Sequence, residues 1–308
     1  FRNVDTIYFG GGTPSFVDSS FIKEILELIP KNHANEITIE VNPGTVDINK
    51  LKVYKEAGIN RLSIGLQSTQ DRLLKQIGRI HDFEDFLNTY NMAKDIGFDS
   101  INVDLMIGLP NQSIQDIKQS LEIITNLEPK HISVYSLIVE ENTKIADLIA
   151  SNALQLPDEE LERNMYWYVK NYLELKGYNH YEISNFAKTG FESRHNLHYW
   201  HCDEYIGLGA GAHSYIAGKR YNNLLIPEKY IETEKIKENI LSLTDEDKKT
   251  ERFIMGMRLV EGVEEKFADN KEALEKYINL GYILRKNGKV MFTDKGFDVS
   301  NFILSEII

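Results

Sequence analysis

Short apolar segments alternate regularly with amphipathic segments of helical period through the first half of the chain, and this alternation constrains the fold most. The apolar segments have the length of β-strands and are residues 6–9, 36–41, 61–65, 100–106 and 131–136. The helical segments between them are residues 19–29, 48–57, 82–96 and 113–127. Strand–helix–strand units at this spacing predict an α/β fold with parallel strands and right-handed crossovers, either an open sheet or a barrel.

Residues typical of helix ends support these bounds. Asp18 and Ser113 stand where N-caps are expected, and Gly58 and Gly97 stand where C-caps are expected. Ligands of parallel α/β folds bind at the carboxyl ends of the strands. We therefore look for functional residues at the ends of the predicted strands.

The pattern changes in the second half of the chain. A polar stretch at residues 140–156 precedes a helix at 158–176, and residues 178–217 are rich in His, Asn, Tyr and Gly. Near the end, two helical segments and an Asn-Gly hairpin turn at 287–288 predict a small α+β, winged-helix-like domain. The expected organisation is a main domain over residues 1–217, a linker over 218–244 and the winged-helix-like domain over 245–308.

Charge and cysteine content limit the possible partners. The net charge of −12 argues against sequence-independent nucleic-acid binding, which needs a basic surface, and we expect no nucleic-acid partner. No apolar run approaches the roughly 20 residues of a membrane helix and no signal peptide precedes the first strand, so we expect a cytoplasmic protein with no membrane span. The single cysteine, Cys202, excludes an internal disulfide.

The run Gly-Gly-Gly-Thr-Pro at residues 10–14 follows the first predicted strand directly. Three glycines let the backbone approach a ligand closely and expose successive N–H groups, although a plain tight turn gives the same pattern. The run lacks the Gly-Lys-Ser/Thr ending of a P-loop and the spacing of a dinucleotide-binding fingerprint. No zinc-type spacing of Cys and His is present either.

Polar residues at successive strand ends favour a ligand over a plain turn. Glu40, Gln67 and Asp104 lie at or near the ends of three predicted strands, and Arg79 follows a short helix. Any one of them alone is more often a satisfied core group, but burying Glu40 or Asp104 without partners would be costly. Together they indicate one pocket, and a zwitterionic ligand with a ribose and a cationic centre would satisfy both acids and amides.

Four motifs then carry a specific resemblance. Gly-Gly-Gly-Thr-Pro, Glu-Val-Asn-Pro, Ile-Gly-Leu-Gln-Ser and Asp-Leu-Met-Ile-Gly-Leu-Pro, in this order and spacing, resemble the radical SAM coproporphyrinogen III oxidase family over essentially the whole chain. The resemblance implies a partial, open, TIM-like (β/α)6 barrel. It assigns the methionyl amino and carboxylate end of S-adenosylmethionine (SAM) to Gly11, Gly12 and Thr13. It assigns the remaining SAM contacts to Glu40, Gln67, Arg79 and Asp104.

The main departure from the family concerns the iron–sulfur cluster. The family binds a 4Fe–4S cluster through Cys-x-x-x-Cys-x-x-Cys in a loop after the first barrel strand, and we expect that strand and loop to precede Phe1. Cys202 cannot replace three thiolate ligands. We therefore expect no metal ligands in this chain and no reductive cleavage of SAM by these residues alone.

A second motif distinguishes branches of the family. Glu-Ile-Ser-Asn-Phe-Ala at 182–187 leads into His-Asn-x-x-Tyr-Trp at 195–200, which resembles the HemW, or heme-chaperone, branch. His195 and His198 offer imidazoles suited to heme iron, and Tyr199 and Trp200 offer rings for a porphyrin face, with Asn196 completing the motif. A structural loop with hydrogen-bonded side chains is the plain alternative. Weaker candidates for heme ligation are His201, Cys202 and His213.

The main hypothesis is a cytoplasmic heme chaperone. It binds heme or porphyrin, with SAM and the cluster supporting the bound state, and passes heme to a respiratory-chain hemoprotein; a homodimer is a further expectation. The alternative is an enzyme, an oxygen-independent coproporphyrinogen III oxidase in which a 5′-deoxyadenosyl radical abstracts hydrogen from a propionate side chain. A third possibility is a degenerate scaffold that binds neither SAM nor heme.

Overall fold

The computed structural model of the chain describes residues 4–31 and 33–308. The chain divides into two units, Phe1–Glu192 and Ser193–Ile308, and each is described by itself. The first unit contains the strands and helices whose alternation dominates the sequence. The second contains a small antiparallel sheet and a helical end with a hairpin.

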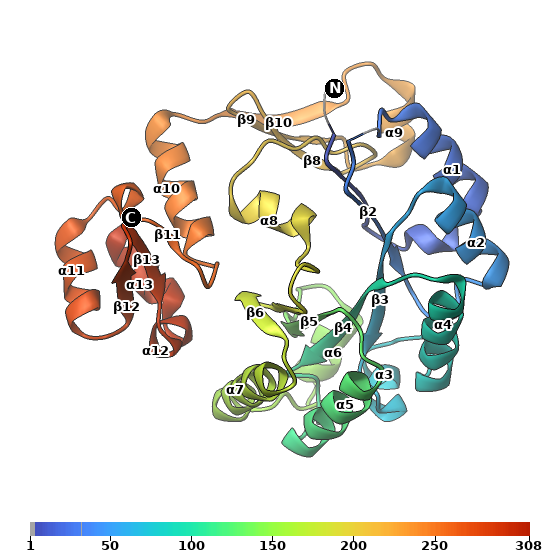
Figure 1. The fold of residues 1–308 in the computed structure, drawn as a ribbon, viewed down its shortest axis with the longest axis horizontal. Helices are drawn as coiled ribbons and strands as arrows, with labels where there is room; N and C mark the ends of the chain where they lie inside the picture. The colour runs from blue at the N-terminus through green and yellow to red at the C-terminus, as the bar shows by residue number, and fades with distance from the viewer. Residues whose placement is uncertain (1–3, 32) are drawn as a thin grey trace. The chain divides into compact units, whose positions relative to one another are not determined.

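A curled seven-stranded sheet is the frame of the first unit (Figure 1). Its strands are β1 (Thr6–Phe9), β2 (Glu36–Val41), β3 (Arg61–Gln67), β4 (Ser100–Ile107), β5 (His131–Ser136), β6 (Asn179–Glu182) and β7 (Asn185–Ala187). Their order is β1-β2-β3-β4-β5-β7-β6; β1 to β5 pair in parallel, β7 is antiparallel to β5, and β6 is antiparallel to β7. The predicted α/β partial barrel is therefore confirmed, and its parallel strands end along one rim.

Helices connect the parallel strands and cover one face of the sheet. They are α1 (Ser19–Leu28), α2 (Ile48–Ala57), α3 (Asp71–Gln76), α4 (Phe83–Ile96), α5 (Ile114–Asn126), α6 (Lys144–Ala150) and α7 (Glu159–Leu175), with a 3-10 turn at Pro14–Phe16. Ser113 caps α5 in a capping box, in which its side chain accepts the backbone N–H of Asp116. Gly58 and Gly97 end α2 and α4 with φ of 102° and 93°, so these predicted caps are confirmed.

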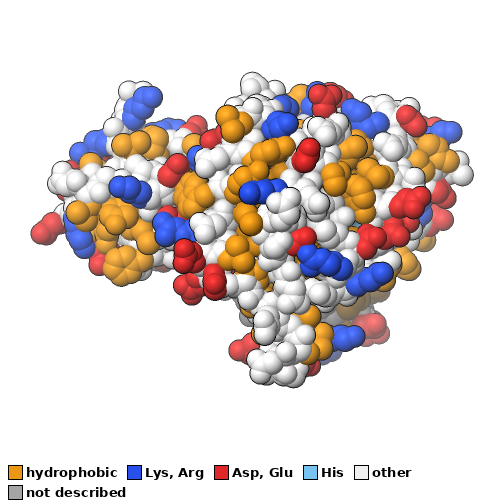
Figure 2. All heavy atoms as spheres, turned by 90° about the horizontal axis from the view of Figure 1, so that it is seen from below, with side chains coloured by type: hydrophobic (Ala, Val, Ile, Leu, Met, Phe, Trp, Pro, Cys, Tyr) orange, Lys and Arg blue, Asp and Glu red, His pale blue; other side chains and the backbone are white. Residues whose placement is uncertain are grey.

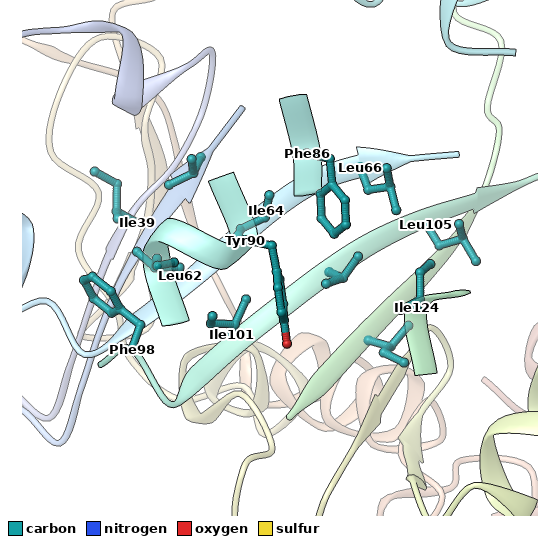
Figure 3. Close-up of a cluster of buried hydrophobic side chains, with 14 of the residues drawn as sticks. Ile39, Leu62, Ile64, Leu66, Phe86, Tyr90, Phe98, Ile101, Leu105 and Ile124 are labelled. Carbon is teal, nitrogen blue, oxygen red and sulfur yellow. The ribbon is translucent and has the colours of Figure 1, made fainter. Parts of the chain in front are cut away.

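The helix-facing side of the sheet forms the hydrophobic core of the first unit. In Figure 3, Phe86 and Tyr90 of α4 lie against Leu62, Ile64 and Ile101 of β3 and β4. All five side chains are at most 2% exposed. Burial of an apolar side chain of this size contributes roughly 1.5–3 kcal/mol, so this face fixes the helices on the sheet.

The opposite face of the same strands is polar. Successive side chains of a strand point to opposite faces, and here every second residue is hydrophilic. Thr38, Ser63, Asn102, His131 and Ser133 all lie on this inner face and are at most 6% exposed. Ser63, Asn102, His131 and Ser133 are joined by hydrogen bonds, so this part of the barrel interior is a polar network.

The second unit begins with one helix and a three-stranded antiparallel sheet. The elements are α8 (Arg194–Trp200), β8 (His213–Ile216), β9 (Lys219–Asn223), α9 (Pro227–Glu232) and β10 (Lys237–Ser242), with sheet order β10-β9-β8. Residues 218–244, for which the sequence predicts a linker, thus contain β9, α9 and β10. The boundary of the units at Ser193 places α8 in the same unit as this sheet.

The end of the chain has a winged-helix-like arrangement with its own core. Its elements are α10 (Asp245–Gly256), β11 (Val263–Glu264), α11 (Lys271–Asn279), β12 (Ile283–Lys286), β13 (Lys289–Phe292), α12 (Asp294–Asp298) and α13 (Ser300–Ile307), with a 3-10 turn at Glu265–Phe267. Asn287 and Gly288 adopt φ of 52° and 76°, as a type I′ hairpin turn requires, so the predicted turn is confirmed. Phe253, Leu274 and Val290 are fully buried in this core.

The surface shows no dominant charge on the face drawn in Figure 2. Lys and Arg side chains are interspersed there with Asp and Glu, and apolar side chains form separate small groups. Among residues 4–31 and 33–308, none of the helices is long and apolar enough to cross a membrane.

Candidate functional site

In the glycine run after β1, Gly10 lies close to the Tyr8 ring, whereas Gly11 and Gly12 face open space. A Cβ atom on Gly10 would lie 2.6 Å from a ring carbon of Tyr8, so only glycine fits there. Gly11 and Gly12 adopt left-handed φ of 79° and 55°, and a Cβ on either would meet no atom within 4 Å. Their backbone therefore faces room that a ligand could fill.

The carboxylate of Glu40 is held beside this run. The Tyr8 hydroxyl donates a hydrogen bond of 2.9 Å to Glu40 Oε1, and the Gly11 N–H donates one of 3.2 Å to Oε2. Burial and the charge of Glu40 raise the pKa of Tyr8 well above its ordinary value, so Tyr8 remains a donor. The carboxylate oxygens keep further lone pairs for a ligand.

A second group of polar side chains surrounds Gly65 on β3. A Cβ on Gly65 would lie 3.1 Å from both Asn42 Oδ1 and Gln67 Nε2, and 3.9 Å from Arg79 Nη2. Arg79 Nη1 donates to Asn42 Oδ1 over 3.1 Å, and Asn42 Nδ2 donates to Thr13 Oγ1 over 2.9 Å. The missing side chain at Gly65 thus lets these residues of separate segments meet.

Gln67 ends β3 in a strained conformation. Its φ is 70°, which is unusual for a residue other than glycine, and the pairing of β3 with β4 shifts between Gly65 and Gln67. Such a bulge re-aims a side chain at the end of a strand. Outliers of this kind cluster at ligand sites.

A cavity of about 400 Å³ opens beside this group. Its walls include Thr13, Asn42, Arg79 and His81, with the apolar side chains of Phe16 and Ile80 at the edge. This volume lies within the range of small-molecule sites, roughly 300–1,000 Å³.

Asp104 lies on the inner face of β4, one strand further along. Asn102 Nδ2 donates to Asp104 Oδ1 over 2.7 Å, and Ser63 Oγ donates to Oδ2 over 3.3 Å. Burial raises the pKa of Asp104 to about 6, partly offset by the hydrogen bond from Asn102 and raised further by the charge of Glu40. A carboxylate with such a pKa gains most from a cationic partner.

The charges of these groups act on one another directly. The pKa of Tyr8 responds to Glu40 and to Asp104, and that of Arg79, lowered by burial, is partly restored by Asp104. Of the residues that the resemblance assigns to SAM, Gly11 therefore contacts Glu40, and Glu40, Asp104 and Arg79 lie within electrostatic reach of one another or of a shared neighbour. This set suits a zwitterion that also carries a cationic centre.

The chain does not supply the three thiolate ligands that an iron–sulfur cluster of this family needs. The chain has a single cysteine. Within the part of the chain that the structure describes, no three His, Cys, Asp or Glu side chains are grouped so that they could hold a metal ion. Residues 1–308 therefore do not fit a 4Fe–4S cluster by themselves.

The predicted heme residues lie on α8 of the second unit. Ser193 caps this helix by accepting the N–H of Asn196. His195 Nε2 is 2.9 Å from the hydroxyl of Tyr199, four residues on, and the two rings meet edge to face. The Tyr199 ring also packs edge to face on Tyr205, with centroids 4.8 Å apart.

The next histidine of α8 has a carboxylate partner. His198 Nδ1 is 2.8 Å from Asp203 Oδ2. A carboxylate in this position orients the imidazole ring, as in many metal-binding histidines. Trp200 follows, and its buried indole N–H has no hydrogen-bond partner among the described residues.

The weaker candidates for heme ligation, His201, Cys202 and His213, lie outside α8. His201 lies 3.7 Å from the Glu261 carboxylate, and His213 is an exposed residue at the start of β8. Burial raises the pKa of Cys202, so its thiol stays protonated and is a poor ligand for iron.

Comparison with known proteins gives a consistent result. Residues 1–124 match the Radical SAM superfamily. The chain is 40% identical over 273 residues to the heme chaperone HemW of Bacillus subtilis (strain 168), an alignment that covers 86% of this chain and 72% of that relative. It is 36% identical over 321 residues to the heme chaperone HemW of Lactococcus lactis, which covers 98% and 84%. The chain belongs to the HemW branch of the radical SAM proteins.

A solved structure supports the fold of this HemW-branch chain. The coproporphyrinogen III oxidase HemN from Escherichia coli superimposes with a TM-score of 0.83 at 21% identity, over 99% of this chain and 77% of that one. At this identity the likeness concerns the fold alone, and it confirms the partial radical SAM barrel.

Several residues of this HemW-branch protein that lie at the candidate site were not predicted from the sequence. Tyr8, Asn42, Asn102 and His131 contact predicted site residues directly or through one neighbour. A signal for three of them exists in the sequence. Parallel strands buried on both faces are usually apolar throughout, whereas these strands have polar residues at most alternate positions. Such alternation indicates a polar barrel interior.

Proposed function

We propose that this protein is a heme chaperone built on a SAM-binding scaffold, which binds heme and passes it to a hemoprotein of the respiratory chain. The observation that carries the proposal is the similarity to proteins named heme chaperone HemW over almost the entire chain. The chemistry of α8 supports it, because that helix presents imidazole and aromatic groups together.

Heme would be held by α8. His195 and His198 supply imidazoles, and the hydrogen bond to Asp203 holds the His198 ring in one orientation. Tyr199 and Trp200 supply flat, partly apolar rings for the porphyrin face, and Asn196 lies in the same turn. In this proposal Tyr199 releases His195 when heme binds, since its hydroxyl now contacts Nε2.

SAM would be held at the carboxyl ends of the barrel strands. The backbone of Gly11 and Gly12, with Thr13, would take its amino acid end. Glu40, Gln67, Arg79 and Asp104 would take the remaining contacts. A 4Fe–4S cluster, with ligands outside these residues, would supply electron transfer when bound. This chain would bind and orient SAM, and its two carboxylates would offer partners for the positively charged groups of SAM.

A heme titration followed by absorbance tests the proposal. The intact protein is compared with His195→Ala, His198→Ala and the double variant. His33→Ala, an exposed histidine of the first unit, is the control. We expect an altered Soret band and about tenfold weaker binding for at least one α8 variant, a larger loss for the double variant and no change for His33→Ala. Wild-type affinity and spectrum in the double variant would remove α8 from heme ligation.

A further inference from the structure

A chain of hydrogen bonds runs through the interior of the barrel and ends at Asp104. The Tyr181 hydroxyl lies 2.8 Å from His131 Nε2, and His131 Nδ1 lies 2.6 Å from Asn102 Oδ1. Asn102 Nδ2 donates to Asp104 Oδ1 over 2.7 Å and to Ser63 Oγ over 2.7 Å. These hydrogen bonds therefore link β6, β5, β4 and β3 across the polar face of the sheet.

The direction of each hydrogen bond in this chain is fixed by chemistry. The Asn102 amide must present its NH₂ group to the carboxylate, because its oxygen would be repelled there. Its Oδ1 then accepts from Ser133 Oγ over 3.0 Å and from His131 Nδ1, so the His131 proton is on Nδ1. His131 Nε2 consequently accepts from the Tyr181 hydroxyl, and every donor points toward Asp104.

Burial keeps this arrangement in one protonation state. His131 is fully buried and Asn102 is 2% exposed. Burial, reinforced by the charge of Arg61, lowers the pKa of His131 well below its ordinary value, so the ring stays neutral with a single proton. A neutral imidazole with both nitrogens occupied is a rigid support for the amide of Asn102.

We infer that Asn102 and His131 are positioning residues for the SAM site: they hold the Asp104 carboxylate in one orientation and keep it ionised for a cationic ligand. The inference rests on the proposed SAM role of Asp104. Asn102 touches that carboxylate directly, and His131 acts through Asn102. A bare carboxylate in this interior would instead take up a proton or rotate.

Other charged and titratable groups also act on Asp104 and must be kept constant. They come from five different segments and are Tyr8, Glu40, Arg61, Arg79 and Tyr135. None of them is changed in the test below. A shift in the pH dependence of binding then reports on Asn102 and His131 alone.

Calorimetric titration of the intact protein with SAM between pH 5.5 and 8.5 (roughly the range around the pKa of Asp104) tests the inference. The variants are Asn102→Leu, which removes the amide donor, and His131→Phe, which keeps a ring. Thr38→Val is the matched control, because Thr38 lies on the same inner face and its buried hydroxyl has no partner among the described residues. Asp104→Asn tests the SAM role itself.

We expect SAM affinity at pH 7 to fall about tenfold or more in Asn102→Leu and less in His131→Phe, with Thr38→Val unchanged. In both variants the pH below which affinity declines should move upward, which lost packing alone would not cause. Ser63→Ala removes another donor to Asp104 and gives the same upward shift should Asn102→Leu not fold.

Two results would overturn the inference in distinguishable ways. Loss of affinity in Asp104→Asn, with wild-type affinity and pH profile in both Asn102→Leu and His131→Phe, would end the positioning role and leave the SAM site intact. Wild-type affinity in Asp104→Asn would remove Asp104 from SAM binding, and the proposed site with it.

Discussion

The three glycines after β1 serve two different needs. Gly10 is required by the Tyr8 ring, which would overlap any side chain at that position. At Gly11 and Gly12 the backbone has a left-handed conformation that favours glycine, and the space in front of both residues is open. The sequence alone shows only three adjacent glycines, and the structure is needed to separate these roles because Tyr8 and Glu40 approach through the fold.

Gly12→Ala should weaken SAM binding far more than it weakens the fold. An alanine at φ of 55° costs about 1 kcal/mol, but its methyl group would also occupy the space proposed for the ligand. Gly97→Ala, at a helix C-cap with φ of 93° and open space, is the matched control for backbone strain. Calorimetry with SAM and denaturant unfolding of both variants measure the two effects. Equal losses of affinity in the two variants would contradict the role of Gly12.

Asp104 gives the stability of the unliganded protein a predictable pH dependence. Its pKa in the folded state, about 6, is above the ordinary 3.8, so the folded state binds this proton more tightly than the unfolded state. Its contribution to the free energy of unfolding is therefore fully present below about pH 4 and is lost as the pH rises through about 6. The expected loss is on the order of 1–3 kcal/mol.

Urea unfolding of the wild type and of Asp104→Asn between about pH 4 and pH 7.5 measures this contribution, since other titrations cancel in the difference. The wild type should lose stability relative to the variant as the pH rises. A difference that does not depend on pH would show that Asp104 titrates normally.

At the scale of helices and strands, an element could be predicted where its own residues carry an apolar periodicity or a cap. The strands β1 to β5 and the helices between them were predictable, because their apolar periodicity and their caps agree. The strands β6 and β9 were not, because Asn179–Glu182 and Lys219–Asn223 are polar and gain their order from long-range pairing. Helix α6 falls in the polar stretch at residues 140–156, where no helix is predicted from the sequence, and Thr143 is its N-cap.

The same reasoning applies to the candidate site. Residues at strand ends could be named from the sequence because parallel strands end on one rim. The links between Thr13, Asn42 and Arg79 could not, because they depend on a side-chain gap at Gly65 that only the packed structure reveals.

The capping box of α10 provides a prediction for a single element. Thr244 accepts the N–H of Asp247, and the Asp247 carboxylate accepts the N–H of Thr244. Thr244→Ala should cost about 1 kcal/mol of unfolding free energy, whereas Thr244→Ser keeps the hydroxyl and should cost only a few tenths. Chemical denaturation measures both, and equal stabilities of the alanine and serine variants would show that the cap does not matter.

At the scale of the whole molecule, the described residues form two separate hydrophobic cores. The core of the first unit is centred on the sheet and its helices, and the core of the second is formed by α10, α11, α13 and the hairpin. Each unit therefore has a source of stability of its own, and scanning calorimetry should resolve two unfolding transitions.

Core truncations should affect the two transitions separately. Leu274→Ala leaves a cavity in the second core and Leu62→Ala leaves one in the first, each at a cost of about 2–5 kcal/mol. Leu274→Ala should lower the midpoint of one transition and Leu62→Ala that of the other. A single transition that shifts as a whole in both variants would contradict independent cores.

The most direct test of the account is a transfer assay with the intact protein, its cluster reconstituted. The protein is loaded with heme and mixed with a heme-free respiratory hemoprotein, and in parallel it is incubated with coproporphyrinogen III, SAM and a reductant. We predict that the heme spectrum moves to the acceptor and that no protoporphyrinogen IX is formed. Formation of protoporphyrinogen IX, with no heme retained or transferred, would show that the protein is an oxidase and not a chaperone.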